Sequence, residues 1–562
     1  MTNHYTNERN HQILISLLKA HSVRKVVASP GMTNSVFVGS IQNDPYFEVY
    51  SCVDERSAAY MACGLSLESG EPVVISCTGA TAARNYMSGA TEAFYSKLPI
   101  LIVTSSQPNR NIGQLFAQVT DRTSPPKDTC SLSLELPTCN SKDDEWFCEV
   151  QTNKALTELR RRGGTPVHLN LITTYSYNEK TALTATVLPA ARAIHRIGSD
   201  GVMPRLEGER NGVFVASHKK WDTALISAVE RFCENYNAVV FVDHTSNYPG
   251  KYRVPFALAI NQAGINKANI PAFTVDTLIH IGEITGEEGS PRMIKSKQTW
   301  RVSEDGEIRD YFRNMNYVFE MSEKSFFSAY ATDNKKITTY YEECLSYNKT
   351  LEIRRDNQLD TMPFSNVWIA QKTALLIPNH STVVLSILNT LRTWNYATFK
   401  DEVKVYCPVG GFGIDGATSI MLGASLVNSK QLYFEVTGDL AFFYDLNALG
   451  NRHVGKNVRI LLVNNGLGFE FKKSYAMAYR LMGDEVDTFV AASGHYGQKS
   501  SLLVKHYAED LGFEYISASS KEEFEKTLPE FVNPEMSDKP ILFECFIDSN
   551  DESTALNIIH NR

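Results

Sequence analysis

The fold of this chain is decided by residues 434–468, which read FEVTGDLAFFYDLNALGNRHVGKNVRILLVNNGLG. The apolar run at 432–436 predicts a strand that leads into a Gly-Asp turn, and 442–449 predicts a helix. Residues 458–463 predict a second strand, buried on both faces because its apolar and long-chain residues do not alternate with polar ones. This strand ends in Asn464-Asn465-Gly466. If the sheet is parallel, both strands end at the same edge, where open α/β folds bind ligands.

Polar groups at that edge suit a metal-bound phosphate. Asp439 and an asparagine side chain supply the oxygen ligands that Mg²⁺ prefers. The backbone N–H groups after Asp439 open the predicted helix, and such groups bind phosphate. Together these features predict a magnesium-bound diphosphate. Each turn alone, Gly-Asp or Asn-Asn-Gly, is also common as a purely structural turn.

The spacing of these residues resembles a known motif. Asn465 follows Asp439 by 26 positions (465 minus 439), as in the G-D-(G)-x-about-26-N-N motif of thiamine-diphosphate-dependent enzymes. The longer match GDLAFFYDLNAL is similar to the synthase family of menaquinone biosynthesis, which joins 2-oxoglutarate to isochorismate. The resemblance implies Asp439, Asn465 and the Leu467 carbonyl as Mg²⁺ ligands, with Gly438 and Leu440 beside the cofactor.

A second motif, DERSAAYMACG, begins at Asp54 and opens a predicted helix. Taken alone, Glu55 in the first helical turn simply complements the helix dipole. However, the motif is similar to the helix that carries the activating glutamate of nearly all thiamine-diphosphate enzymes. There, a carboxylate hydrogen-bonded to the cofactor's aminopyrimidine helps to remove the thiazolium C2 proton, a task for which its pKa must be tuned. The resemblance implies that Glu55 is the catalytic residue.

Four further loops match the same family. Ser29-Pro30-Gly31 resembles its S-P-G, and Cys77-Thr78-Gly79 resembles its T-S-G-T-A loop, although a glycine turn that caps a helix explains the latter equally well. Residues 113–118, GQLFAQ, resemble the G-x-x-x-x-Q loop of acetolactate synthases. Residues 411–417, GFGIDGA, match the G-x-x-G-I-D-G motif of the thiamine-diphosphate family. Ile414 would bend the cofactor so that its N4′ meets C2, or it is a core isoleucine. The cofactor contacts implied by these loops are Pro30, Gly31, Thr78, Gly79, Gln118, Gly413 and Ile414.

Strand and helix patterns alternate along most of the chain, which predicts an α/β fold of three doubly wound domains with mainly parallel sheets. We expect a pyrimidine-binding domain at 1–178, a central domain at 212–345 and a diphosphate-binding domain at 360–562. A Pro- and Gly-containing stretch at 178–211 predicts a linker. The strands that we expect are 25–29, 48–52, 72–77, 100–104, 167–171, 238–243, 277–282, 382–387, 432–436, 458–463 and 540–546.

Bulk composition narrows the classes of partner. The net charge of −8 comes without a cluster of Lys and Arg, which argues against nucleic acid or an anionic membrane surface as the main partner. No run approaches 18 apolar residues, so we expect no membrane span. Residues 1–10 lack the apolar core of a signal peptide, and the ten scattered cysteines form no C-x-x-C. We therefore expect a cytoplasmic protein with reduced thiols.

The resemblance to the menaquinone-pathway family fails at its substrate-binding arginines. Thr33, Gln107 and Val409 stand where that family's motifs carry arginine, and Arg392 keeps the fourth. Guanidinium groups bind carboxylates bidentately, so the loss of three should cost several kcal/mol of dicarboxylate binding. We therefore expect a paralogue that acts on another 2-oxo acid, with an aldehyde, a ketone or a second 2-oxo acid as acceptor. The candidate substrate residues, each also explicable as a structural or solvated residue, are Arg84, Gln107, Arg392 and His495.

The predicted function is decarboxylation of a 2-oxo acid followed by carboligation, with thiamine diphosphate and Mg²⁺. Alternatives within the class are simple decarboxylation to an aldehyde and the menaquinone-pathway synthase itself. A binding protein without catalysis would be expected to lose Glu55, Asp439 or Asn465, and all three are present. A nicotinamide dehydrogenase would need G-x-G-x-x-G after a strand, which is absent. In this family two chains complete each site, so the resemblance implies a homodimer or homotetramer.

Overall fold

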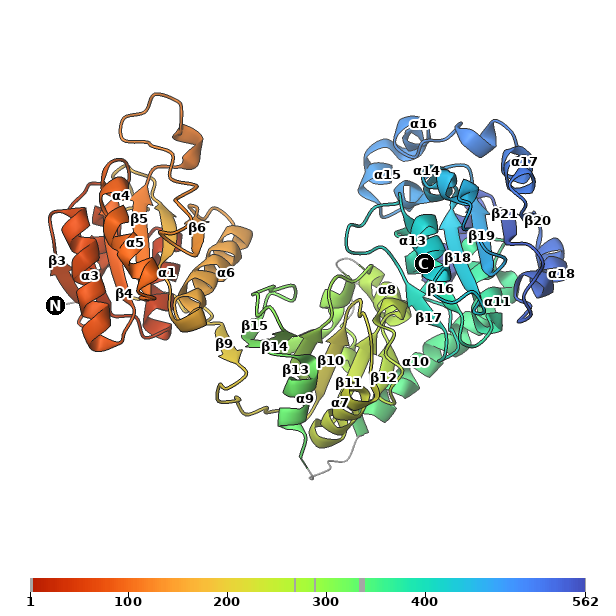
Figure 1. The fold of residues 1–562 in the computed structure, drawn as a ribbon, viewed down its shortest axis with the longest axis horizontal. Helices are drawn as coiled ribbons and strands as arrows, with labels where there is room; N and C mark the ends of the chain where they lie inside the picture. Colours follow the sequence, from red (N-terminus) through yellow and green to blue (C-terminus); the bar gives the residue numbers. More distant parts are fainter. Residues whose placement is uncertain (1–3, 267–268, 288–289, 333–338, 561–562) are drawn as a thin grey trace. The chain divides into compact units, whose positions relative to one another are not determined.

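The computed structural model describes residues 4–266, 269–287, 290–332 and 339–560, and these fall into two compact units. Unit 1 comprises residues 1–202 and 305–320, and unit 2 comprises residues 203–304 and 321–562. Almost all strand pairs in both units are parallel, which confirms the predicted α/β class with mainly parallel sheets (Figure 1).

Unit 1 is built on a six-stranded parallel sheet of order β3-β2-β4-β5-β7-β6. Every strand expected in this region is present, and β6 is additional because its half-buried LSLEL sequence gives little apolar signal. The strands are β2 (Lys25–Ala28), β3 (Glu48–Ser51), β4 (Val73–Thr78), β5 (Ile100–Ser106), β6 (Leu132–Leu136) and β7 (Val167–Ile172). The helices are α1 (Arg9–Ala20), α2 (Ser35–Ile41), α3 (Glu55–Ser69), α4 (Ala82–Asn85), α5 (Met87–Tyr95) and α6 (Lys142–Glu158).

Helices cover both faces of this sheet. Successive residues of a strand point to opposite faces, so Val26 packs with α1 and α6 while Val27 packs with α3 and α5. Figure 1 shows α3 and α5 side by side over one face. This double winding leaves the carboxyl ends of the strands free to carry the loops at 29–34, 52–55, 79–81 and 107–122.

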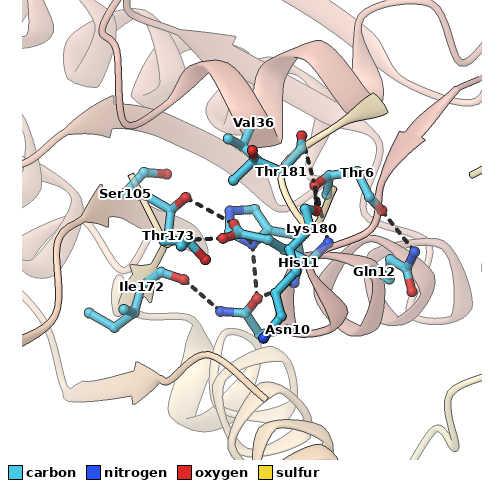
Figure 2. Close-up of polar contacts among 12 residues, drawn as sticks. Thr6, Asn10, His11, Gln12, Val36, Ser105, Ile172, Thr173, Lys180 and Thr181 are labelled. Carbon is cyan, nitrogen blue, oxygen red and sulfur yellow. Dashed lines mark hydrogen bonds and ion pairs between the residues drawn. The ribbon is translucent and has the colours of Figure 1, made fainter. Parts of the chain in front are cut away.

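The N-terminal segment of unit 1 is fixed by buried polar contacts (Figure 2). Asn10 donates through Nδ2 to the carbonyl of Ile172 at 2.7 Å, at the end of β7. Thr6 donates through Oγ1 to the carbonyl of Lys180 at 3.1 Å. The chain around Thr6 forms β1 (Tyr5–Thr6), which pairs antiparallel with β8 (Leu183–Ala185).

The stretch at 178–211 was expected to be a linker, yet it contains two short strands. β8 pairs with β1, and β9 (His195–Gly198) pairs in parallel with β15 (Met315–Glu320) of the same unit. Both strands were missed because their partners lie far away in the sequence and the local sequence shows only the Pro and Gly residues typical of turns. The boundary between the two units nevertheless falls within this stretch, after residue 202.

The first sheet of unit 2 contains parallel strands in the order β12-β11-β10-β13-β14. The two strands expected here, β11 and β13, are present. The strands are β10 (Asn211–Val215), β11 (Ala238–Val242), β12 (Arg253–Pro255), β13 (Thr274–Ile281) and β14 (Lys295–Ser303), and the helices are α7 (Thr223–Tyr236), α8 (Ala257–Asn266), α9 (Glu323–Tyr330) and α10 (Thr339–Gln358).

The second sheet of unit 2 has the order β17-β16-β18-β19-β21-β20, and all its strands are parallel. One face packs against α13 and α14, and the other carries an aromatic cluster that includes Phe434, Phe531 and Phe543. The strands are β16 (Thr382–Leu385), β17 (Lys404–Tyr406), β18 (Tyr433–Gly438), β19 (Val458–Asn464), β20 (Glu514–Ala518) and β21 (Ile541–Phe546). The helices are α11 (Asn366–Thr373), α12 (Asn389–Trp394), α13 (Ala417–Ser425), α14 (Asp439–Tyr444), α15 (Met477–Met482), α16 (Val486–Phe489), α17 (Leu503–Asp510), α18 (Lys521–Phe531) and α19 (Ser549–Ile559).

Within the described part of the chain, no helix has the length and apolar character needed to cross a membrane. All ten cysteines are free thiols. The thiol of Cys139 donates a hydrogen bond to the sulfur of Cys148 at 3.6 Å, and the two form no disulfide.

Candidate functional site

In unit 2 the structure brings Asp439 and Asn465 to one edge of the second sheet. Asp439 follows β18 and Asn465 follows β19, and the two strands pair in parallel with Gly438 opposite Val463. Asp439 is 5% exposed, and burial raises the pKa of its carboxyl group to about 7 although backbone N–H groups, including that of Gly466, oppose the shift. A buried carboxylate of this kind favours a cation beside it.

The turn after β19 holds the other two predicted metal ligands. The Asn465 side-chain oxygen accepts a hydrogen bond from the Leu467 N–H at 3.1 Å, and the Leu467 carbonyl accepts one from the Phe469 N–H at 3.0 Å. Both oxygens retain a second acceptor position. Gly466 has φ of +75°, and a Cβ there would lie 2.2 Å from Nε2 of Gln498. This conformation favours glycine in the turn.

The contact with Gln498 places the loop of His495 beside this turn. His495 is exposed and immediately precedes the 3₁₀ turn Tyr496–Gln498. Gln498 was not among the residues predicted from the sequence, because only the tertiary fold brings it to Gly466.

The predicted helix at 442–449 is shifted in the structure. α14 begins at Asp439 and ends at Tyr444, and the 3₁₀ segment Leu446–Gly450 follows. Gly438 precedes α14 as its N-terminal cap residue, and Leu440 is half-buried. The helix thus starts directly at the end of β18, so Asp439 lies in its first turn.

The loop before α13 carries the remaining predicted contacts of this unit. Gly413 and Ile414 are both half-buried, and a Cβ on Gly413 would lie 2.2 Å from Oδ1 of Asp415. The loop follows β17, which is parallel to β16 and β18, so it lies at the same edge of the sheet as Asp439.

In unit 1 the structure brings the S-P-G and C-T-G loops together. Gly31 approaches Thr78 so closely that a Cβ would lie 2.7 Å from the Thr78 Cβ. Thr33, which stands where the menaquinone-pathway motif has arginine, is buried and donates to the carbonyl of Ser105 at 2.7 Å. Pro30 is exposed beside Gly31, and Gly79 follows β4. Thr33 therefore ties its loop to the end of β5, and it provides no positive charge for a substrate carboxylate.

Glu55 is the first residue of α3, at the same strand edge. Its Oε2 accepts a hydrogen bond from Nδ2 of Asn85 at 3.0 Å, and the side chain is half-buried. Asp54 caps the helix by accepting from the Arg56 N–H at 3.0 Å. The cap is thus supplied by Asp54, which leaves the Glu55 carboxylate available for another partner.

The other predicted substrate residues of unit 1 have structural partners. The Arg84 guanidinium donates to the Asp121 carbonyl at 2.5 Å, and Gln107 accepts through Oε1 from Asn111 at 3.2 Å. Gln118 is exposed in the left-handed region, with φ of +61°. Arg122, which sequence analysis missed, is buried and donates to the Gln107 carbonyl at 2.9 Å. No local pattern distinguishes Arg122 from a surface arginine.

Arg392 of unit 2 also has an internal partner. Its Nη1 lies 2.5 Å from Oε1 of Glu470, in the loop after β19. Glu470 was not among the residues predicted from the sequence. The two residues are 78 positions apart, so only the structure pairs them.

Glu435 on β18 gives a prediction about pH. It is fully buried, and burial, assisted by Asp445, raises the pKa of its carboxyl group from 4.5 to about 8. Between these values the folded state holds a proton that the unfolded state releases, so stability falls as pH rises. In the wild type, the free energy of unfolding should fall by up to about 1.4 kcal/mol per pH unit in this range because of Glu435. Glu435→Gln should remove this contribution. Thermal unfolding of both proteins at pH 5.5 to 8 measures the difference.

The matched control is Glu525→Gln, because Glu525 is 53% exposed in its ion pair with Lys372. It should follow the wild type at every pH. Parallel unfolding curves for Glu435→Gln and the wild type would show that Glu435 is ionised in the folded state.

Among the residues that the structure describes, no group of three or more His, Cys, Asp or Glu side chains is arranged to hold a metal. The predicted Mg²⁺ set is of another kind, since it has one carboxylate, one amide and one backbone carbonyl.

Comparisons with known proteins show the family of this chain. The family model described as "Thiamine pyrophosphate enzyme, N-terminal TPP binding domain" matches residues 9–124. Proteins named 2-succinyl-5-enolpyruvyl-6-hydroxy-3-cyclohexene-1-carboxylate synthase are similar over 98% of this chain and 98% of their own length. They come from Phocaeicola vulgatus, Bacteroides fragilis and Bacteroides thetaiotaomicron, with 30%, 29% and 28% identity. The chain belongs to this family of thiamine-diphosphate-dependent enzymes.

The residues present fit the cofactor of a thiamine-diphosphate-dependent enzyme. A diphosphate with a hard metal ion calls for oxygen donors, and Asp439, Asn465 and Leu467 offer three at one sheet edge. Asp439 supplies the buried carboxyl group that a cation would keep ionised.

Proposed function

We propose that this protein decarboxylates a 2-oxo acid with thiamine diphosphate and Mg²⁺ and joins the remaining fragment to a carbonyl acceptor. The observation that carries the proposal is the buried Asp439 carboxyl group beside Asn465, in a chain of the thiamine-diphosphate family. Glu55, at the start of α3 and held by Asn85, supplies the acid–base group that this chemistry needs.

Each proposed residue has a distinct task. Asp439, Asn465 and the Leu467 carbonyl would hold Mg²⁺, and Gly438 and Leu440 would lie beside the diphosphate. Glu55 would hold a hydrogen bond to the aminopyrimidine ring. When bound, thiamine diphosphate supplies the nucleophilic carbon and takes up the electron pair left as CO₂ departs. The other proposed cofactor contacts are Pro30, Gly31, Thr78, Gly79, Gln118, Gly413 and Ile414.

Two alternatives remain within this class. Without an acceptor, the same residues support simple decarboxylation to an aldehyde. The second candidate is the activity stated in the name of the relatives from Phocaeicola and Bacteroides, and their full-length similarity favours it. That candidate needs a donor with a second carboxylate, so the choice of donor separates it from the main proposal.

The test is CO₂ release from a panel of 2-oxo acids, supplied with thiamine diphosphate and Mg²⁺, with and without aldehyde and 2-oxo acid acceptors. We expect release from pyruvate or another monocarboxylic 2-oxo acid, and a coupled product when an acceptor is present. Release from 2-oxoglutarate with consumption of isochorismate would establish the second candidate instead. No release from any 2-oxo acid would refute the proposal.

We further propose a cytoplasmic homodimer or homotetramer whose active sites are shared between chains, as the family resemblance implies. The ten free thiols agree with a reducing compartment. The partners would be a small 2-oxo acid and a carbonyl acceptor, with neither nucleic acid nor a membrane.

A further inference from the structure

A buried ion-pair cluster lies next to the proposed cofactor edge in unit 2. Arg392 lies on α12, which follows β16, and Glu470 lies in the 3₁₀ turn Phe469–Lys472, which follows β19. Nη1 of Arg392 lies 2.5 Å from Oε1 of Glu470, and Nζ of Lys473 lies 2.7 Å from its Oε2. The side chains of Arg392 and Glu470 are 14% and 18% exposed, and that of Lys473 is 2% exposed. Both oxygens of the Glu470 carboxylate are therefore engaged by cations.

The cluster is fixed in place by its backbone. Leu388 has φ of +65°, which is unusual for a residue with a branched side chain, and its carbonyl accepts the Arg392 N–H at 3.0 Å. Nε of Arg392 donates to the Gly286 carbonyl at 3.4 Å. Arg392 is thus held through its backbone by Leu388 and through its side chain by Gly286, unlike the flexible arginine of a surface pair.

The cluster lies beside the Asp439 edge. β16 and β19 both pair with β18, so all three loops emerge at the same end of the sheet. Gly468 lies between the Asp439 turn and the Glu470 turn. A Cβ on Gly468 would lie 3.2 Å from Leu440, the residue after Asp439, and 3.1 Å from Phe471, the residue after Glu470. A donor acid at the proposed cofactor would therefore meet the loop that carries Glu470.

The charges of the cluster are already compensated. Burial works against ionisation of Glu470, but the positive charges of Lys473 and Arg392 outweigh it and hold the pKa of Glu470 below its ordinary value. Lys473 also acts electrostatically on the buried Glu552. A ligand carboxylate that approached Arg392 would meet the fixed negative charge of Glu470 and would have to displace it.

We propose that Glu470 is the specificity-determining residue for the donor acid. By occupying Arg392 it takes the place of a ligand carboxylate, so the site accepts 2-oxo acids that carry no second carboxylate. This inference rests on the proposed function. Beyond the arginines that Thr33, Gln107 and Val409 replace, it identifies a residue of this chain that acts against dicarboxylic donors at the cations Arg392 and Lys473.

The first test compares CO₂ release from pyruvate and from 2-oxoglutarate by the wild type and by Glu470→Gln, which removes the charge and keeps the shape. The wild type should prefer pyruvate. Because like charges facing each other across a binding site strongly disfavour binding, the variant should shift the kcat/KM ratio towards 2-oxoglutarate by at least about tenfold, mainly through KM. Arg392→Gln added to Glu470→Gln should cancel the shift. Glu525→Gln, which changes an exposed ion pair on α18, is the matched control and should leave the ratio unaltered.

The second test measures binding without turnover, by calorimetric titration of glutarate and of butyrate. In Glu470→Gln, and in Glu470→Ala as a second variant, glutarate should bind at least about tenfold more tightly relative to butyrate than in the wild type. A preference of the wild type for glutarate, or a ratio that does not move in either variant, would overturn the inference. If no 2-oxo acid is decarboxylated at all, the proposed function fails, and the titrations still decide the role of Glu470.

Discussion

Replacing Glu55 by glutamine should lower turnover by about 10²- to 10⁴-fold while thiamine diphosphate still binds, the range expected when one general acid–base group is lost. Glutamine keeps the length of the side chain and its hydrogen bond with Asn85, but it cannot carry the negative charge that the task needs. The measurements are CO₂ release with the best 2-oxo acid and quenching of tryptophan fluorescence by the cofactor.

Glu68→Gln is the matched control, because Glu68 is an exposed carboxylate on the same helix, α3. It should retain wild-type turnover. If Glu55→Gln turned over at the wild-type rate with bound cofactor, the role proposed for Glu55 would be wrong. If it lost the cofactor as well, Glu55 would act in binding.

The sequence predicted the strands around the site accurately because they are buried on both faces. β18 and β19 lie within two residues of the expected bounds, since uninterrupted apolar runs mark such strands clearly. β6 and β20 escaped notice because they are edge strands with half-buried, mixed sequences. Helix α14 starts three residues before its apolar pattern does, because the Gly-Asp turn passes directly into it.

The residues of the candidate site likewise fall into those that could be predicted from the sequence and those that could not. Asp439 and Asn465 could be selected from sequence, since one spacing and two strand ends place them at a common edge. The occupation of Arg392 by Glu470 could not, since the ion pair joins loops 78 positions apart. Likewise, Thr33 looked like a lost arginine in the sequence, and only the structure shows its hydroxyl group bonded to the Ser105 carbonyl. Local pattern reveals residues that lie at strand ends, whereas partners contributed by distant loops require the fold.

Replacing Asp439 by alanine should abolish Mg²⁺-dependent binding of thiamine diphosphate. Asp439 is the one carboxylate of the proposed ligand set, and it is buried where a cation would be its compensating charge. Loss of partners that merely orient a metal ligand typically costs about 10- to 100-fold in affinity, so loss of the ligand itself should cost at least about 100-fold. Titration of the cofactor at fixed Mg²⁺, followed by calorimetry, measures the change.

Asp401→Ala is the control for this variant, since Asp401 is a 69% exposed carboxylate of the same unit, paired with Arg253. It should bind the cofactor as the wild type does. A circular dichroism spectrum that is unchanged in Asp439→Ala would separate a lost ligand from a lost fold. Because Asp439 would hold the Mg²⁺ on which cofactor binding depends, cofactor affinity in the variant should also stop responding to Mg²⁺ concentration. If the affinity of the variant still rose with Mg²⁺ concentration, Asp439 would not be a metal ligand, and the site proposed at the ends of β18 and β19 would be wrong.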